Sequence, residues 1–233
     1  MRLPNPTCIK DVDTTQPNCI YCKKPAVKNG FTTYRKQRYF CKSCKKSFLL
    51  SYINAGYDTD VSKTIVCLLK EGCGIRSLSR LTSVCINTIV TRIKRIASTI
   101  RKPSIFFGQS YEMDELRTFI QRKDKPVWIA YAIRRETGEV VEFRVGNRSN
   151  KTLGGVIDTL LLSQPKIIHT DKLMNYRQLI PAFLHRTKAY GINHIERHNL
   201  SMRTHLKRLS RRSICFSKSQ SMLEACLKIY FWG

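Results

Sequence analysis

The sequence predicts an α/β fold, a mixed sheet with flanking helices, preceded by two smaller basic units. Three observations lead to this prediction. Two C-x2-C pairs stand near the start of the chain, and the next segment has apolar residues at helical spacing, interrupted by glycines. From residue 105 the spacing changes to that of strands. The expected units are 1–57, 58–102 and 103–233.

The charge of the chain is strongly basic. Lys and Arg number 42 against 16 Asp and Glu, which gives a net charge of +26. This excess exceeds what solubility requires and indicates a polyanionic partner. Nine of the sixteen acids nevertheless lie within residues 103–191. A chain suited to binding phosphate has therefore concentrated its carboxylates in one region.

Membrane binding is the alternative for a basic chain. The sequence contains no run of about 18 apolar residues, and its first sixteen residues lack the apolar core of a signal peptide. We therefore expect a soluble, intracellular protein without a membrane partner. In a reducing compartment the ten cysteines indicate metal binding rather than disulfides.

The first motif consists of two cysteine pairs. Their spacing is C-x2-C, eighteen residues, then C-x2-C, and the cysteines are Cys19, Cys22, Cys41 and Cys44. Each pair can present two thiolates to one ion, and the two pairs together complete a tetrahedral site for one structural Zn²⁺. A redox pair and four unrelated core cysteines are the alternatives.

The segment between the cysteine pairs predicts the hairpin of a zinc ribbon. It contains an Asn29-Gly30 turn signal followed by a strand-like run over residues 34–40. The basic residues of this run are expected to face DNA phosphates; they are Arg35, Lys36 and Arg38.

The second unit predicts three helices, over residues 60–72, 74–84 and 85–102. The second helix places Ile75, Leu78 and Leu81 on one face, and the third carries isoleucines three or four residues apart. Two short helices followed by a longer basic one are typical of a helix-turn-helix. The third helix would then contact DNA through Asn87, Thr88, Thr91, Arg92 and Arg95. The alternative is a linker bundle whose charges are only solvated.

The third unit opens with three strand-like runs, over residues 105–120, 127–136 and 139–146, separated by turn residues. An apolar helix over 150–163 and a short buried strand over 166–171 follow. The order β-β-β-α-β is that of a ribonuclease-H-like fold. There the first strand is central, and the strand after the helix lies parallel beside it.

Two acids are expected to meet in that topology. Asp114 lies in the middle of the first strand, and Asp171 ends the strand predicted to lie beside it. By period-two alternation, Glu112 shares the face of Asp114, whereas Glu115 points the other way. Paired carboxylates suit Mg²⁺, and two ions could activate the attacking oxygen and stabilise the leaving one. Ordinary strand-end acids paired with arginines are the alternative.

A basic helix expected over residues 191–212 carries one acid, Glu196. At about 100° per residue, Arg203 and Lys207 align with Glu196, and the histidines lie on the opposite side. The core-facing stripe would comprise Ile195, Met202, Leu206 and Leu209. Glu196 therefore suits either a third metal-binding carboxylate, with the two basic residues holding phosphates, or a local salt bridge.

Three segments carry a family resemblance: YEMDEL, HTDKLMNYRQLIP and IERHNLSMRTHLKRLSRRSICFSKS. Together with the four-cysteine ribbon and the helix-turn-helix, they resemble transposases of the insertion-sequence-one family. The resemblance implies a D-D-E set, Asp114, Asp171 and Glu196, that binds two Mg²⁺ or Mn²⁺ ions and cuts and joins DNA. Arg117 and Leu173 depart from the tryptophans expected at their positions.

The resemblance also implies partners and a location. These are double-stranded DNA, as inverted-repeat element ends and as target, and further copies of the chain in a homo-oligomer on DNA. The expected location is the bacterial cytoplasm, in association with the nucleoid. Two other functions stay open, a non-catalytic repressor of element ends and a ribonuclease-H-like nuclease without strand transfer. A pure binding protein would not need three acids at compatible positions.

Overall fold

The computed structural model describes residues 17–50, 60–187 and 191–233. The chain divides into two compact units, residues 1–54 and 55–233. The expected boundary between residues 57 and 58 falls outside the described residues. No helix in the described part of the chain is long and apolar enough to cross a membrane.

The first unit is a small antiparallel sheet in the order β1-β2-β3. Its strands are β1 (Val27–Phe31), β2 (Gln37–Cys41) and β3 (Lys46–Leu49). The prediction of a turn at Asn29-Gly30 is wrong. Gly30, at a φ of +66°, lies inside β1 at a register shift, and the chain reverses over residues 32–36 instead. A glycine at positive φ within a strand is typical of a bulge as well as of a turn, so the sequence signal was ambiguous.

The second unit begins with three helices, α1 (Asp60–Lys70), α2 (Ile75–Thr82) and α3 (Ile86–Thr99), close to the predicted ranges. Buried Leu78 and Ile89 pack in their common core. Leu81, expected on the buried face of α2, is 64% exposed. It lies three residues after Leu78 in an eight-residue helix, about 60° around the axis from it.

A five-stranded mixed sheet follows in the order β6-β5-β4-β7-β8. Its strands are β4 (Ser110–Phe119), β5 (Pro126–Arg134), β6 (Val140–Gly146), β7 (Ile167–His169) and β8 (His185–Arg186). The first three form an antiparallel meander, and β7 runs parallel to both β4 and β8. The predicted ribonuclease-H-like topology is therefore confirmed, with β4 in the centre.

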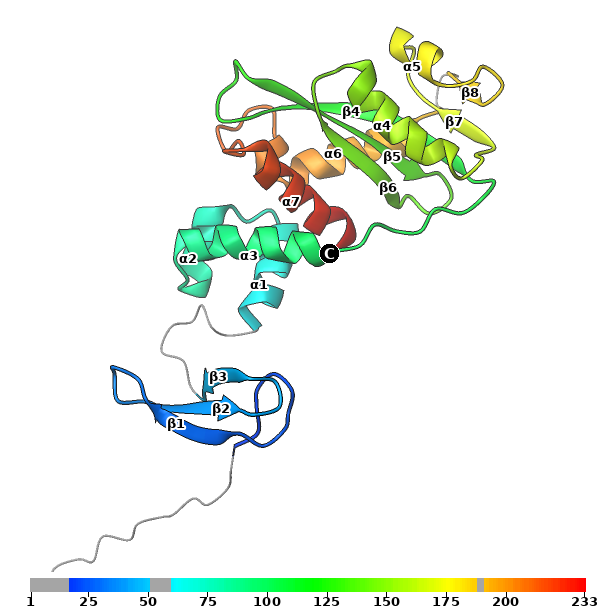
Figure 1. The fold of residues 1–233 in the computed structure, drawn as a ribbon. Coiled ribbons are helices and arrows are strands. Elements are labelled where there is room, and N and C mark those ends of the chain that lie inside the picture. The colour runs from blue at the N-terminus through cyan, green and yellow to red at the C-terminus, as the bar shows by residue number, and fades with distance from the viewer. Residues whose placement is uncertain (1–16, 51–59, 188–190) are drawn as a thin grey trace, which may run out of the picture. The chain divides into compact units, whose positions relative to one another are not determined.

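Helices cover both faces of this sheet (Figure 1). On one face lie α4 (Asn150–Leu161), which is the predicted crossover helix, and α5 (Met174–Leu179). On the other face lie α6 (Asn193–His205) and α7 (Gln220–Trp232). Because side chains alternate along a strand, the adjacent acids Asp114 and Glu115 of β4 face different helices.

The helix expected over residues 191–212 ends earlier, at His205. Leu206 is extended, and a short 3-10 helix, η2 (Lys207–Leu209), follows. The predicted core-facing stripe of Ile195, Met202, Leu206 and Leu209 is buried, as expected. Leu209 is buried and the carbonyl oxygen of Arg208 accepts a hydrogen bond from Oγ1 of Thr118, and these contacts hold the segment in a separate turn. Lys207 therefore does not share a helix with Arg203.

Helix α7 joins the three helices to the sheet. One side of it, with Met222 and Ile229, packs in the core of α1–α3, and the other, with Leu223 and Leu227, packs against the sheet. Gly72 reinforces this junction, because a Cβ at that position would lie 1.9 Å from the carbonyl oxygen of His205. Helices and sheet thus share continuous packing within the second unit.

Candidate functional site

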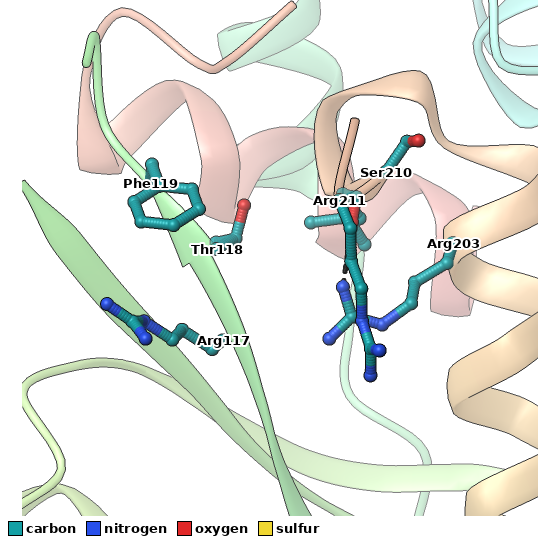
Figure 2. A pocket seen from close by; sticks show the side chains of 7 residues that line it. Arg117, Thr118, Phe119, Arg203, Ser210 and Arg211 are labelled. Atoms are coloured by element: carbon teal, nitrogen blue, oxygen red, sulfur yellow. Dashed lines mark hydrogen bonds between the residues drawn. The ribbon is translucent and has the colours of Figure 1, made fainter. Parts of the chain in front are cut away.

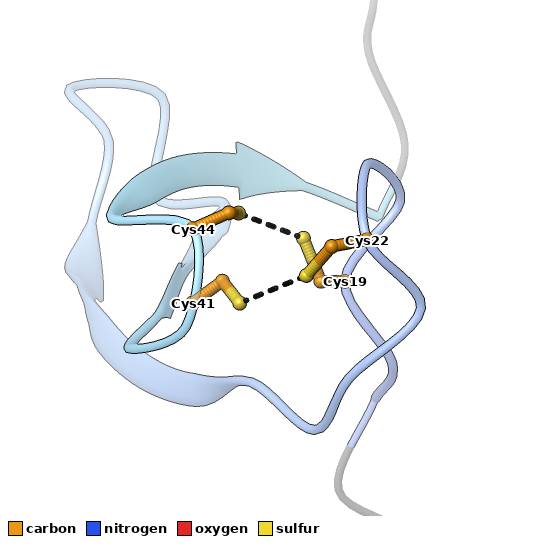
Figure 3. A group of neighbouring side chains, drawn as sticks. All are labelled: Cys19, Cys22, Cys41 and Cys44. Carbon is orange, nitrogen blue, oxygen red and sulfur yellow. Dashed lines mark hydrogen bonds between the residues drawn. The ribbon is translucent and has the colours of Figure 1, made fainter.

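The four cysteines of the first unit converge on one point (Figure 3). The Sγ atoms of Cys19 and Cys44 are 3.6 Å apart, those of Cys22 and Cys41 are 3.4 Å apart, and all four lie within 4.8 Å of one another. A tetrahedral site with Zn–S bonds of about 2.3 Å requires sulfur atoms about 3.8 Å apart. The quartet is therefore suited to one tetrahedral ion.

Two thiols of the quartet differ in protonation, because burial raises the pKa of Cys44 to about 12 whereas the pKa of Cys41 is lowered. The backbone N–H of Cys44 lowers the pKa of the Cys41 thiol to about 6, and burial opposes this shift. A thiolate is the form that binds a metal. The chain thus presents a thiolate at a buried position, where an unpaired negative charge is costly without a cation.

The second candidate centre lies at the edge of β4. Strand β7 pairs only with residues 110–112 of β4, so the edge of β4 beyond Glu112 is open on that side. Asp114 lies on this open edge, and Asp171 follows the end of β7. Asp171 Oδ1 accepts a hydrogen bond of 2.9 Å from the backbone N–H of Leu173. The topology thus brings the two predicted acids together.

A third acid completes this cluster. Among the described residues, the acids whose oxygens lie within 4.8 Å of one another are Asp114, Asp171 and Glu115. Glu115 faces α4 and α5, and its carboxylate lies 3.4 Å from Nε of Arg148. Burial raises the pKa of the Tyr176 hydroxyl on α5, and the negative charges of the three acids raise it further. Tyr176 therefore lies beside the cluster.

Helix α6 lies on the opposite face and contacts Asp114 through Asn199. Asn199 Nδ2 donates a hydrogen bond of 2.6 Å to Asp114 Oδ2, and the hydroxyl of Tyr131 donates one of 2.9 Å to Asn199 Oδ1. Tyr131 is also the cross-strand partner of Asp114 on β5. These two contacts fix the orientation of the Asp114 carboxylate. Sequence reasoning missed both residues, although Asn199 aligns with Glu196 at helical spacing.

Glu196 lies on α6, one turn before Asn199, and its side chain is exposed. His198 turns toward β5, where its Nδ1 lies 3.2 Å from the Tyr131 hydroxyl. At about 100° per residue, Glu196 lies about 60° around the helix from Asn199, on the side away from His198. Arg203 lies on the same side, about 40° from Asn199. Among the described residues, Glu196 is outside the carboxylate cluster that contains Asp114 and Asp171.

The start of α6 is anchored by Glu112, a fully buried acid that the sequence placed on the Asp114 face. Its Oε2 accepts a hydrogen bond of 3.0 Å from the backbone N–H of Ile195, and its Oε1 lies 2.6 Å from Nδ1 of His194. A carboxylate at a helix N-terminus satisfies donors that lack a partner within the helix. The period-two pattern was the signal that could have identified this contact.

The environment of Asp114 favours a cation. Burial raises the pKa of the Asp114 carboxyl to about 6, and the nearby charges of Glu115 and Asp171 add to the shift. Above that pH the folded chain holds adjacent negative charges in a partly buried place. Carboxylate oxygens are the ligands that Mg²⁺ prefers. The residues at this edge therefore fit a hard divalent cation.

We expect the Asp114→Asn variant to melt at a higher temperature than the wild type near pH 7.5 in the absence of divalent cations. The folded-state pKa of Asp114 lies above its unfolded value of 3.8, so the folded state binds the proton more tightly. The stability that the Asp114 proton contributes is therefore fully present below about pH 4 and is lost as the pH rises through about 6. Near pH 7.5 the free energy of unfolding of the wild type is therefore expected to be lower than that of Asp114→Asn by on the order of 3 kcal/mol. Thermal melts at about pH 7.5 and about pH 4.5 measure it, and the gap should narrow at the lower pH.

The control for this measurement is Asp124→Asn, since Asp124 is an exposed acid on the turn after β4. Adding Mg²⁺ should stabilise the wild type and not Asp114→Asn, because a ligand that binds only the folded state raises its melting temperature. A lower melting temperature for Asp114→Asn near pH 7.5 would contradict the charge argument.

The predicted DNA-contacting residues lie in three places. On the first unit, Arg35 and Arg38 are exposed and Lys36 is half-buried. On α3, Asn87, Thr91 and Arg95 are exposed and Thr88 is half-buried, whereas Arg92 donates a hydrogen bond of 3.0 Å to Oγ of Ser62. Beside the carboxylates, Arg203 is half-buried and Lys207 is exposed on η2.

Residues 109–231 match a protein-family model described as IS1 transposase. Insertion element iso-IS1n protein InsB of Shigella dysenteriae is 33% identical over 113 residues, which cover 48% of this chain and 86% of that protein. Insertion element IS1 2 protein InsB of Escherichia coli (strain K12) is 37% identical over 108 residues, covering 46% of this chain and 65% of that protein.

A solved structure is also similar, the cryoEM structure of a simian T-cell lymphotropic virus intasome in complex with the PP2A regulatory subunit B56 gamma. The similarity covers 71% of this chain and 66% of that chain, at 13% identity and a TM-score of 0.38. The ribonuclease-H-like assignment rests on the strand order of the sheet. The family match spans both sheet acids and all of α6, and extends over more than half of the chain. The chain belongs to the IS1 transposase family.

Proposed function

We propose that this chain is a DDE transposase that binds the ends of its insertion sequence and catalyses metal-dependent DNA strand cleavage and strand transfer. The observation that carries the proposal is the meeting of Asp114 and Asp171 at the open edge of β4, inside the segment that matches the family model. A protein that only bound DNA would gain nothing from adjacent carboxylates at a sheet edge.

The third acid of the proposed set is Glu196. It lies on α6 one turn before Asn199, which contacts Asp114. Glu115, the acid found with Asp114 and Asp171, is paired with Arg148. The family membership and the position of Glu196 on α6 support the set Asp114, Asp171 and Glu196.

Each residue has a defined role in this proposal. The three carboxylates hold two Mg²⁺ or Mn²⁺ ions, and these supply the positive charge that stabilises the phosphodiester transition state. Asn199 and Tyr131 orient Asp114. Arg203 and Lys207 hold the DNA backbone beside the carboxylates.

The remaining units supply DNA recognition. The four-cysteine ribbon (1–57), held by one Zn²⁺, presents Arg35, Lys36 and Arg38 to phosphates. The helix-turn-helix (58–102) presents the residues named on α3 to the element ends. The catalytic domain (103–233) completes the chain, and copies of the chain assemble on two element ends in the bacterial nucleoid.

The test is a strand-transfer assay with duplexes that carry the terminal inverted repeats of its own element. We expect wild-type protein with Mg²⁺ to nick the ends and join them to target DNA, with Asp171→Asn as the inactive control. Binding without nicking would identify a repressor, and nicking without joining would identify a nuclease. Either result would contradict the proposal.

A further inference from the structure

A basic cavity lies near the end of α6 (Figure 2). Its volume is about 310 Å³, and it lies between the second half of β4 and the segment around the end of α6. The polar residues that line it are Arg117, Thr118, Arg203, Ser210 and Arg211. None of the described residues in its wall is acidic. The cavity is therefore positively charged without an internal counter-ion.

Arg203 is held in place at this cavity. Its Nη1 donates a hydrogen bond of 3.0 Å to the carbonyl oxygen of Leu209, and its side chain is half-buried. In Figure 2 the side chains of Arg203 and Arg211 extend into the same region, whereas Arg117 extends along Phe119. A guanidinium that is already oriented loses little freedom when it binds an anion.

The two guanidinium groups oppose one another electrostatically. Burial lowers the pKa of Arg203, the positive charge of Arg211 lowers it further, and Asp114 acts in the opposite direction. A bound anion between the two arginines would relieve this repulsion. Thr118, which lines the cavity, lies on the same face of β4 as Asp114.

The wall that carries Ser210 and Arg211 is fixed to the sheet. Thr118 Oγ1 donates a hydrogen bond of 3.2 Å to the carbonyl oxygen of Arg208, and Arg208 Nη1 donates one of 2.9 Å to Oγ of Ser217. Leu209 between them is buried. The cavity is thus formed before any ligand binds.

The position of the cavity identifies which part of a DNA substrate would reach it. Thr118 lies four residues beyond Asp114 on β4, about 13 Å along the strand. This distance exceeds the rise of one nucleotide along a DNA strand, about 3.4 Å. A phosphate in the cavity would therefore belong to a different nucleotide from the one at the carboxylates.

We propose that the cavity is a subsite for a DNA backbone phosphate, which Arg203 and Arg211 bind through their guanidinium groups and Ser210 through its hydroxyl. The proposal rests on DNA being the substrate at Asp114 and Asp171. Planar guanidinium forks match phosphate oxygens, and the net charge of +26 favours a polyanion over a free small anion. Its role is to fix the position of the strand relative to the carboxylates.

The experiment measures binding of end DNA in Ca²⁺, without cleavage, by fluorescence anisotropy. Each duplex carries one uncharged methylphosphonate in place of one phosphate, and the position is moved along the strand. Among the positions at which the neutral linkage weakens wild-type binding, we expect one, with a roughly tenfold effect, whose sensitivity Arg211→Gln loses. Arg212→Gln, at an exposed neighbour outside the cavity, should keep it.

Two outcomes would overturn the subsite. One is an unchanged methylphosphonate profile in Arg211→Gln, and the other is a wild-type profile that has no sensitive position. If inorganic phosphate stabilises the folded protein but no methylphosphonate position weakens binding, the cavity binds a free anion instead. Because binding is measured without cleavage, failure of the strand-transfer assay would leave this result intact, and the two proposals fail separately.

Discussion

The Glu196→Gln variant is expected to lose about a thousandfold in strand cleavage while it binds element ends with wild-type affinity. The substitution keeps the size of the side chain and removes its charge. If Glu196 completes the metal site, an uncharged amide weakens the site by several kcal/mol of transition-state stabilisation. Exposed Glu196 makes no contact that the fold depends on among the described residues, so its melting temperature should not change.

The matched comparison is Glu115→Gln. Glu115 is the acid that lies with Asp114 and Asp171, yet its carboxylate faces α4 and pairs with Arg148. Because Glu115 is a neighbour of the proposed metal ligands, the Glu115→Gln substitution should lower the cleavage rate about tenfold. Single-turnover cleavage with both variants separates the two assignments. A thousandfold loss in Glu115→Gln with near wild-type activity in Glu196→Gln would make Glu115 the third carboxylate.

The sheet was predictable because its signals are local and strong. The runs that became β4, β5 and β6 alternate or stay apolar over the length of a strand, and turn residues separate them. The crossover helix and β7 then follow from the rule that parallel strands need a long connection. Once β7 lies beside β4, Asp114 and Asp171 must approach one another. The meeting of these two acids was therefore a consequence of topology.

The parts that sequence reasoning missed depend on tertiary contacts. The hydrogen bond from Asn199 to Asp114 requires the exact depth at which α6 packs on β4, which periodicity does not fix. The end of α6 at His205 depends on the burial of Leu209 and on the bond from Thr118 to Arg208. The turn in the first unit was misplaced because Gly30 suits a bulge equally well.

Removal of zinc is expected to unfold the first unit and leave the second unit intact. Within the described part of the first unit, the buried core contains five residues, and two of them, Cys19 and Cys41, are predicted metal ligands. A core of this size cannot offset the conformational entropy of its chain. Binding of a structural zinc supplies on the order of 10 kcal/mol, which becomes folding free energy. The second unit has three apolar clusters of its own and does not depend on the ion.

The measurement combines metal analysis with hydrogen exchange on the full chain. We expect about one zinc per chain, and its loss in the Cys41→Ser, Cys44→Ser double variant should abolish protection of backbone amides in β1–β3 alone. Cys85→Ser is the matched control, since Cys85 is exposed and lies outside the quartet.

If the exposed hairpin residues Arg35 and Arg38 bind DNA, the double variant also loses affinity for element ends while the α3 contacts persist. Full zinc retention in the double variant would exclude the cysteine quartet as the site. Retained amide protection without zinc would show that the stacked rings of Tyr39 and Phe48, whose centroids are 5.8 Å apart, stabilise the ribbon without the ion.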